Sequence, residues 1–407
     1  MLNEELIDEI VEKCAGKISV FLGAGASVPL GLPDMMSFWK NAYGEHFVNS
    51  LNSPCPYTIA TRDIQQANVN KESAMRRLVQ TASIGQQRVS PDLEVIYDYI
   101  HNNPILAMVG KGKNHENQVK FLHLYRFTQD HSGHSRSPDF VKYAQNYNNF
   151  RDNFHAWLED ICECIEGLRK MVNESYLIND AHDAVDKAKS CFSFLPMLFR
   201  NDSPVVFTTN YDTIFEALGE SGELGKIGYT LQSGSALRNG RGRRFYFDLQ
   251  HYLQRVEKPL YLFHLHGSVA WKKGRNGLIE DYFPGNHNGK SAIVEPVISK
   301  RQQNKGVFSD LYQIFEKSLY RNSVLLVIGF SFRDDHIKKI VEKRLILKND
   351  FHVLCVAPQN ENEPDMDRHL RELEEKYERK FIWLKEYFGV AQTEESILGT
   401  IAKINPH

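Results

Sequence analysis

The stretch Val20–Asp34, VFLGAGASVPLGLPD, passes directly from an apolar segment into a loop that contains two glycines and an alanine. A loop with so few side chains lets a ligand or another backbone approach its own backbone closely. Where such a loop follows a strand and begins a helix, its N–H groups favour phosphate. The stretch therefore predicts a strand and a tight turn, with a phosphate group as the candidate ligand.

The glycine pattern by itself leaves a second interpretation open, in which the turn is tight and binds nothing. Val28 stands where the usual dinucleotide fingerprint has its third glycine, and no convincing acidic residue follows at the expected spacing of about 20 residues. The ligand must therefore be argued from other parts of the chain.

Composition excludes several classes of protein. The 407 residues contain 49 basic and 51 acidic side chains, a formal net charge of -2, so there is no overall field to attract a polyanion such as nucleic acid. No apolar run approaches the roughly 18 residues that a membrane span requires, and the first residues lack the pattern of a signal peptide. We expect a cytoplasmic protein that binds neither nucleic acid nor membrane.

Short apolar segments alternate with amphipathic helical patterns along the chain, which is typical of a parallel sheet covered on both faces. The expected fold class is α/β, a doubly wound parallel sheet of the Rossmann type. The predicted strands are 18–22, 205–208, 260–265, 324–328, 353–357 and 381–384, and the predicted helices near the end of the chain lie around 308–319, 337–345 and 364–380.

About 180 residues separate the first two predicted strands, far more than a loop between neighbouring elements contains. We expect residues 1–40 and 200–407 to form the core and residues 41–199 to form a large, mainly helical inserted module, with its clearest helix at 150–171. Within it, Cys162 and Cys164 are spaced C-x-C without a second pair of cysteines. A tetrahedral zinc site normally needs such a pair, so no zinc is expected.

Polar residues follow three of the predicted strands, at the carboxyl edge where open α/β sheets bind their ligands. Each group also has a purely structural interpretation, as turn and cap bonds for the residues after 205–208, as a hydrogen-bonded imidazole for the histidine, and as a helix cap for the serine. The candidate residues are Thr209, Asn210, Asp212, His266, Gly329 and Ser331.

Four segments together, GAGAS with GLPD, then TTNYD, LHGS and GFSF, occur in the same order as the motifs of the sirtuin (silent information regulator) family, which they resemble. The resemblance covers about residues 10–40 and 200–400. It implies a doubly wound domain that binds NAD+ and consumes it as a substrate.

The resemblance also implies a role for each matching residue. His266 would be the catalytic histidine, and a side chain with a pKa of about 6.5 can accept a proton from a ribose hydroxyl or a water at neutral pH. Asn210 and Asp212 would line the nicotinamide pocket and take part in catalysis. The remaining NAD+-binding positions would be Gly23, Ala24 and Gly25 at the diphosphate, Ser27 in the nicotinamide pocket, Pro33 and Asp34 in the covering loop, Gly329 and Ser331 at the adenosine ribose, and Thr209.

Two departures from the sirtuin pattern narrow the expected activity. The chain has no C-x-x-C pair for the sirtuin zinc ribbon, and Met35 and Met36 replace an aromatic residue and an arginine of the covering loop. In these respects the chain resembles bacterial sirtuin-like effectors of anti-phage defence, which hydrolyse NAD+ to nicotinamide and ADP-ribose.

The resemblance therefore implies a regulated NAD+ glycohydrolase (NADase). No nucleotide-sensing domain is recognisable after the last predicted strand, so control is expected from a homo-oligomer and from a separate partner such as a HerA-type ATPase (the Nezha arrangement). Two alternatives remain open: a sirtuin-type protein deacylase or ADP-ribosyltransferase, and a non-catalytic NAD+-binding scaffold.

Overall fold

The computed structural model describes most of the predicted core. The described residues are 4–13, 17–32, 175–178, 183–199, 204–226, 228–232, 245–246, 257–273, 279–281, 291–293, 306–359 and 367–404. Pro33, Asp34, Cys162, Cys164 and the predicted helix at 150–171 lie outside them. No helix in the described ranges is long and apolar enough to cross a membrane.

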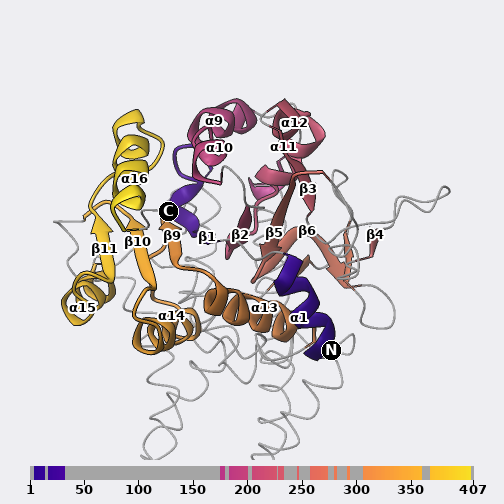
Figure 1. The fold of residues 1–407 in the computed structure, drawn as a ribbon. Helices are drawn as coiled ribbons and strands as arrows, with labels where there is room; N and C mark the ends of the chain where they lie inside the picture. Colours follow the sequence, from indigo (N-terminus) through magenta and orange to yellow (C-terminus); the bar gives the residue numbers. More distant parts are fainter. Residues whose placement is uncertain are drawn as a thin grey trace, which may run out of the picture. The chain divides into compact units, whose positions relative to one another are not determined.

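The main sheet, as far as the structure describes it, has seven strands that all run parallel, in the order β11-β10-β9-β1-β2-β5-β3 (Figure 1). This arrangement confirms the predicted α/β class. The strands are β1 (Ile18–Leu22), β2 (Val205–Thr208), β3 (Thr230–Gln232), β5 (Pro259–His264), β9 (Val324–Ile328), β10 (His352–Val356) and β11 (Phe381–Leu384).

The sheet is doubly wound around β1. The chain adds β2 and β5 on one side of β1 and later adds β9, β10 and β11 on the other side. Figure 1 shows α1, α13, α14 and α15 on one side of the sheet and the remaining labelled helices on the other. The helices are α1 (Glu4–Lys13), α9 (Asp183–Cys191), α10 (Leu195–Leu198), α11 (Ile214–Glu220), α12 (Glu223–Lys226), α13 (Val307–Arg321), α14 (Asp335–Leu347), α15 (Arg368–Lys376) and α16 (Ala391–Ile404).

The core lies where helix α13 packs on the central strands. Every residue of β1, β2 and β9 is buried, which explains why these strands read as continuous apolar runs. The ring of Phe315 lies 5.4 Å from that of Phe21 in β1 and 4.9 Å from that of Phe207 in β2. The predicted apolar stripe of α13 therefore covers the strands that lead to the candidate residues.

A second, antiparallel sheet was not predicted from the sequence. It contains β4 (Phe245–Tyr246), β6 (Gly267–Lys273), β7 (Ile279–Asp281) and β8 (Ser291–Ile293) in the order β4-β7-β6-β8. Strand β6 begins immediately after His266, and Gly267 has a φ of 81°, a conformation that favours glycine. The chain therefore leaves the parallel sheet at the predicted catalytic histidine.

The chain divides into two compact units. One contains Met1–Asp34, Val172–Glu295 and Lys300–His407, and the other contains Met35–Met171 with Pro296–Ser299. Helices α9 and α10 belong to the first unit, where the rings of Phe192 and Phe194 pack on Phe388, although the sequence analysis assigned residues 41–199 to the inserted module. The boundaries and helical character of that module stay a prediction.

Candidate functional site

The carboxyl ends of β1 and β9 lie side by side at the point where the winding of the sheet reverses. Leu22 pairs with Ile328 at the end of the two strands. In a doubly wound sheet the loops after such a pair of strands separate to opposite faces and leave a crevice for a ligand. The glycine loop after β1 and the Gly329–Ser331 loop after β9 both begin here.

The glycines bring these two loops into backbone contact. The Gly23 and Gly25 N–H groups donate to the carbonyls of Ile328 and Gly329, each at 2.9 Å. A Cβ atom on Gly23 would lie 2.5 Å from the Gly329 carbonyl oxygen, and one on Gly329, whose φ is 65°, would overlap the backbone of Gly25 and Ala26. The glycines are therefore required by packing within the protein, whether or not a ligand is bound.

This packing changes what the glycine loop can offer to a phosphate. The loop enters a short 3-10 helix, Ala24–Ala26, in which the N–H groups of Ala26 and Ser27 donate to Gly23 and Ala24 carbonyls. Among the amides of residues 23–27, only that of exposed Ala24 has no acceptor within the described residues. The predicted diphosphate contact at Gly23, Ala24 and Gly25 stays a prediction, with Ala24 as the available donor.

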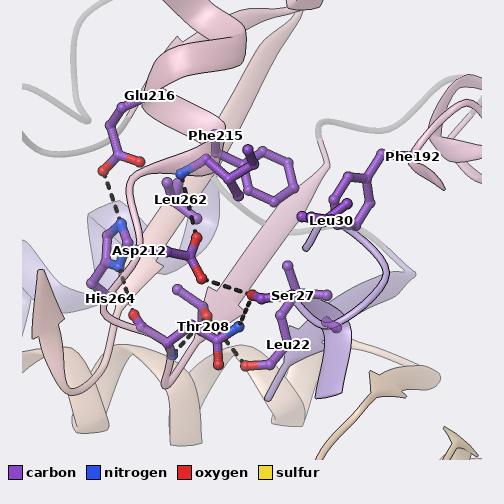
Figure 2. A pocket seen from close by; sticks show the side chains of 13 residues that line it. Leu22, Ser27, Leu30, Phe192, Thr208, Asp212, Phe215, Glu216, Leu262 and His264 are labelled. Atoms are coloured by element: carbon purple, nitrogen blue, oxygen red, sulfur yellow. Dashed lines mark hydrogen bonds and ion pairs between the residues drawn. The ribbon is translucent and has the colours of Figure 1, made fainter. Parts of the chain in front are cut away.

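Ser27, Asn210 and Asp212 form one hydrogen-bonded group at this edge (Figure 2). The Ser27 hydroxyl donates to Asp212 Oδ2 at 2.7 Å and accepts from Asn210 Nδ2 at 2.9 Å. Asn210 Nδ2 also donates to the Gly23 carbonyl at 2.9 Å. The structure thus brings together three of the predicted nicotinamide-pocket residues. In the chain, Ser27 is 183 positions from Asn210 and 185 positions from Asp212.

The amide of Asn210 has a defined orientation. The Gly23 carbonyl can only accept a hydrogen bond, so the side-chain atom next to it is the nitrogen. Both N–H bonds of that nitrogen are then used, and Oδ1 remains as an acceptor. The Asn210 backbone N–H donates to Thr208 Oγ1 at 3.0 Å, and the Thr209 N–H donates to the Leu22 carbonyl at 3.1 Å.

Asp212 is completely buried. Burial raises the pKa of its carboxyl group, while the hydrogen bond from Ser27 and the charge of His264 act in the opposite direction. Asp212 Oδ1 also accepts from the Ile214 N–H at 3.3 Å at the start of α11. The sequence analysis offered a turn bond as the purely structural interpretation of this residue. The structure contains that bond and also the contact between Asp212 and Ser27.

A cavity borders this group, and Figure 2 shows the polar atoms of Ser27 and Asp212 beside apolar side chains from four parts of the chain. Its volume of about 10 Å³ is enough for about one water molecule, so a nicotinamide ring would need the cavity to widen. The lining residues are Leu22, Ala26, Ser27, Leu30, Phe192, Thr208, Asn210, Asp212, Ile214, Phe215, Glu216, Leu262 and His264.

His266 belongs to a second group, formed with Tyr312 and Asp334. Its Nε2 lies 2.9 Å from the Tyr312 hydroxyl and 3.1 Å from Asp334 Oδ2, and all three side chains are buried. Burial, with the Asp334 charge, raises the pKa of Tyr312 well above its usual value, so its hydroxyl keeps its proton. The Val269 N–H donates to the Tyr211 carbonyl at 3.0 Å, which ties the turn of His266 to the loop of Asn210.

Asp334 supports His266 from the loop that also carries Gly329 and Ser331. Its Oδ1 accepts from the N–H groups of His336 and Ile337 at 3.0 and 3.3 Å and so caps α14. The sequence analysis considered the serine as the cap of this helix, but the cap is Asp334. The second oxygen of Asp334 faces the histidine. Ser331 is half-buried in this loop.

Sequence reasoning missed the partners of the candidate residues. Tyr312 lies within α13 and Glu216 lies in the first turn of α11, and His264 precedes His266 by two positions in an apolar strand. The two histidines in LFHLHGS were the only signal for a second polar contact at this strand end. In the described part of the chain, no group of three or more His, Cys, Asp or Glu side chains is arranged to hold a metal ion.

Comparison with known families gives one result that bears on the site. Residues 204–382 match the model of the SIR2-like domain, a range that contains Asn210, Asp212, His266 and the loop after β9. SIR2-like domains belong broadly to NAD-dependent enzymes, so the domain indicates an NAD-related function. No curated protein matches the chain significantly.

Proposed function

We propose that this chain, with its SIR2-like domain at residues 204–382, is an NAD+ glycohydrolase that cleaves NAD+ to nicotinamide and ADP-ribose. The observation that carries the proposal is the convergence of Ser27, Asn210 and Asp212 beside a cavity at the carboxyl edge of a doubly wound sheet. NAD+ is the substrate, and the sheet edge is where such a fold binds a dinucleotide.

In the proposed reaction the bond between the ribose C1′ and the nicotinamide nitrogen breaks, and nicotinamide leaves with the bonding electrons. A water molecule attacks C1′ and loses one proton, which gives ADP-ribose. Ser27 and Asp212 offer hydrogen-bond partners to the carboxamide, and the oriented Oδ1 of Asn210 can accept from the attacking water. Positioning and charge stabilisation supply most of the catalysis in such a cleavage.

His266 would accept a proton from a ribose hydroxyl or from the water. An ionised carboxylate only accepts hydrogen bonds, so Asp334 at 3.1 Å favours the tautomer with its hydrogen on Nε2. Nδ1 is then the basic nitrogen. Asp334 would thus act on the substrate only through the histidine.

The biological setting is part of the proposal and rests on the resemblance alone. In it the enzyme is a cytoplasmic homo-oligomer that depletes NAD+ during anti-phage defence when a partner, such as a HerA-type ATPase, releases its activity. A protein deacylase, an ADP-ribosyltransferase or a scaffold would use the same pocket with a different acceptor or with none. Met35 and Met36, where a deacylase would carry its covering loop, lie outside the described residues.

The test is nicotinamide release from NAD+ by the purified chain and by two variants, Asn210→Ala and His266→Ala. Each variant is expected to lose at least about 100-fold in kcat, the usual contribution of a positioned acid–base group. Lys339→Ala, an exposed change in α14, is the control for handling and folding. Wild-type rates in both site variants would refute the assignment.

Two further arms separate the alternatives. Release that requires an acylated peptide would support a deacylase, and release that appears only with the ATPase partner would place the control in that partner. Binding of NAD+ with no release under any condition would favour the scaffold.

A further inference from the structure

A buried ion pair lies beside the pocket and has no role in the proposed reaction. His264 is the last residue of β5, and Glu216 lies in the first turn of α11. His264 Nε2 is 2.9 Å from Glu216 Oε1, and the two side chains are 2% and 4% exposed. Figure 2 shows the pair next to Asp212.

The second ring nitrogen of His264 points at the backbone of Asn210. His264 Nδ1 is 3.2 Å from the Asn210 carbonyl oxygen, which can only accept, so Nδ1 carries a hydrogen. Nε2 faces a carboxylate, so with Glu216 ionised both nitrogens donate and the ring is an imidazolium. If the proton instead resides on Glu216, Nδ1 still donates to Asn210. The hydrogen bond from Nδ1 to the Asn210 carbonyl is therefore the same for both positions of the proton.

The surroundings of His264 favour the charged form. Burial lowers the pKa of His264, but the Glu216 carboxylate, the Asn210 carbonyl and Asp212 raise it, and the net shift is upward. The indole ring of Trp271 from β6 also contacts His264, in an edge contact with ring centroids 5.6 Å apart.

Glu216 shows that the pair is not a fully satisfied structural bridge. Its Oε2 is buried and has no hydrogen-bond partner within the described residues, and the side chain borders the cavity. A buried carboxylate oxygen without a partner is costly, and such groups concentrate at functional sites. The pair is therefore placed for its effect on the pocket.

That effect reaches the substrate through Asn210. Two different peptide groups of Asn210 are held: Thr208 Oγ1 accepts from the N–H of the Thr209–Asn210 peptide, and His264 donates to the carbonyl of the Asn210–Tyr211 peptide. The side-chain nitrogen of Asn210 is held by Gly23 and Ser27. Loss of the His264 contact would free the Asn210–Tyr211 peptide to rotate and so would shift Oδ1.

We infer that His264, held by Glu216, is a positioning residue that fixes the Asn210 peptide and so presents the Asn210 side-chain oxygen to the substrate. The inference rests on the proposed function, in which Asn210 acts on the NAD+ glycosidic bond.

Two substitutions separate the two contacts of His264. In His264→Gln the amide nitrogen can occupy the position of Nε2 and keep Glu216, whereas in His264→Asn it can occupy the position of Nδ1 and keep the Asn210 carbonyl. We expect kcat for nicotinamide release to fall about 10- to 100-fold in His264→Gln and several-fold less in His264→Asn. If both variants lose kcat equally and in proportion to their loss of thermal stability, the role of His264 is purely structural.

Crystal structures of wild type and His264→Gln separate failure of the inference from failure of the proposed function. A wild-type chain that releases no nicotinamide, alone or with candidate ATPase partners, would refute the function, while the two structures would still show whether Asn210 moves. We expect the Asn210 side chain to leave the Gly23 carbonyl in His264→Gln. An unmoved Asn210, or a wild-type kcat in that variant, would overturn the inference.

Discussion

Asp334 has two oxygens with separate partners, and this makes a sharp test of His266. Oδ1 caps α14 and Oδ2 lies 3.1 Å from His266 Nε2. Asn is as good a cap as Asp, so Asp334→Asn removes the charge beside the histidine and keeps the helix start. We expect kcat for nicotinamide release to fall by about 10- to 100-fold, since the charged orienting group is lost, with little change in thermal stability.

The neighbouring exposed carboxylate is the matched control for Asp334. Asp335→Asn removes one negative charge from the same helix turn without touching His266. It is expected to retain wild-type kcat. If Asp334→Asn and Asp335→Asn lose activity equally, the loss comes from the change of charge at the start of α14 and not from the contact with His266.

Asp212 is expected to oppose folding stability at neutral pH. Its folded-state pKa is raised by burial, so the stability it contributes is fully present below the unfolded carboxyl value of about 4 and is lost as the pH rises through the folded value. Asp212→Asn does not titrate. Its free energy of unfolding, relative to wild type, should therefore increase as the pH rises above about 4, measured by urea denaturation. A constant difference would mean that burial does not perturb this carboxyl group.

At the residue scale the sequence predicted candidate site residues but not their partners. Asn210, Asp212 and His266 stand in short motifs directly after strands, where residue type and position are both visible. The contacts of His264 with Glu216 and of His266 with Tyr312 depend on how α11 and α13 pack against the strands. No local pattern encodes that packing.

At the scale of elements, continuous apolar runs located the parallel strands closely. The bounds of β1, β2, β9 and β11 agree with the prediction, and β5 and β10 differ by one residue at each end. Strands β1, β2 and β9 are buried at every residue, so their sequences need no alternation. The antiparallel sheet was missed because β4, β7 and β8 have two or three residues each, too few to show a period.

The close contact between the loops after β1 and β9 predicts a strong effect of one methyl group. Gly329→Ala places a Cβ against the backbone of Gly25 and Ala26 at a φ of 65°, so the loops must separate. We expect a loss of about 3 kcal/mol or more in the free energy of unfolding, measured with urea. NAD+ binding should weaken as well, because the same loops border the proposed site.

Gly399 in α16 provides the control for this substitution. A Cβ at that position meets no atom within 4 Å, and alanine favours a helix more than glycine does. Gly399→Ala is therefore expected to stabilise the protein by about 0.5–1 kcal/mol. A Gly329→Ala variant as stable as wild type would show that the loops do not pack as closely as described.

At the scale of the whole molecule, the fold gathers residues that are far apart in the sequence. The loops after β1, β2, β5 and β9 contribute Ser27, Asn210, His266 and Asp334, and double winding brings these strand ends to one edge. The predicted strands and the polar residues that follow them were enough to predict that these residues share one edge. The role of residues 41–171 was not predictable in the same way, because their patterns contain no comparable strand ends.

The central claim is hydrolysis of NAD+ at this edge, and the most direct measurement is product analysis by proton NMR of NAD+ incubated with the purified chain, alone and with candidate ATPase partners. The account predicts nicotinamide and free ADP-ribose in equal amounts, and neither product with Asn210→Ala. Nicotinamide without free ADP-ribose would indicate transfer to another acceptor. NAD+ that is bound but unchanged under every condition would contradict the account.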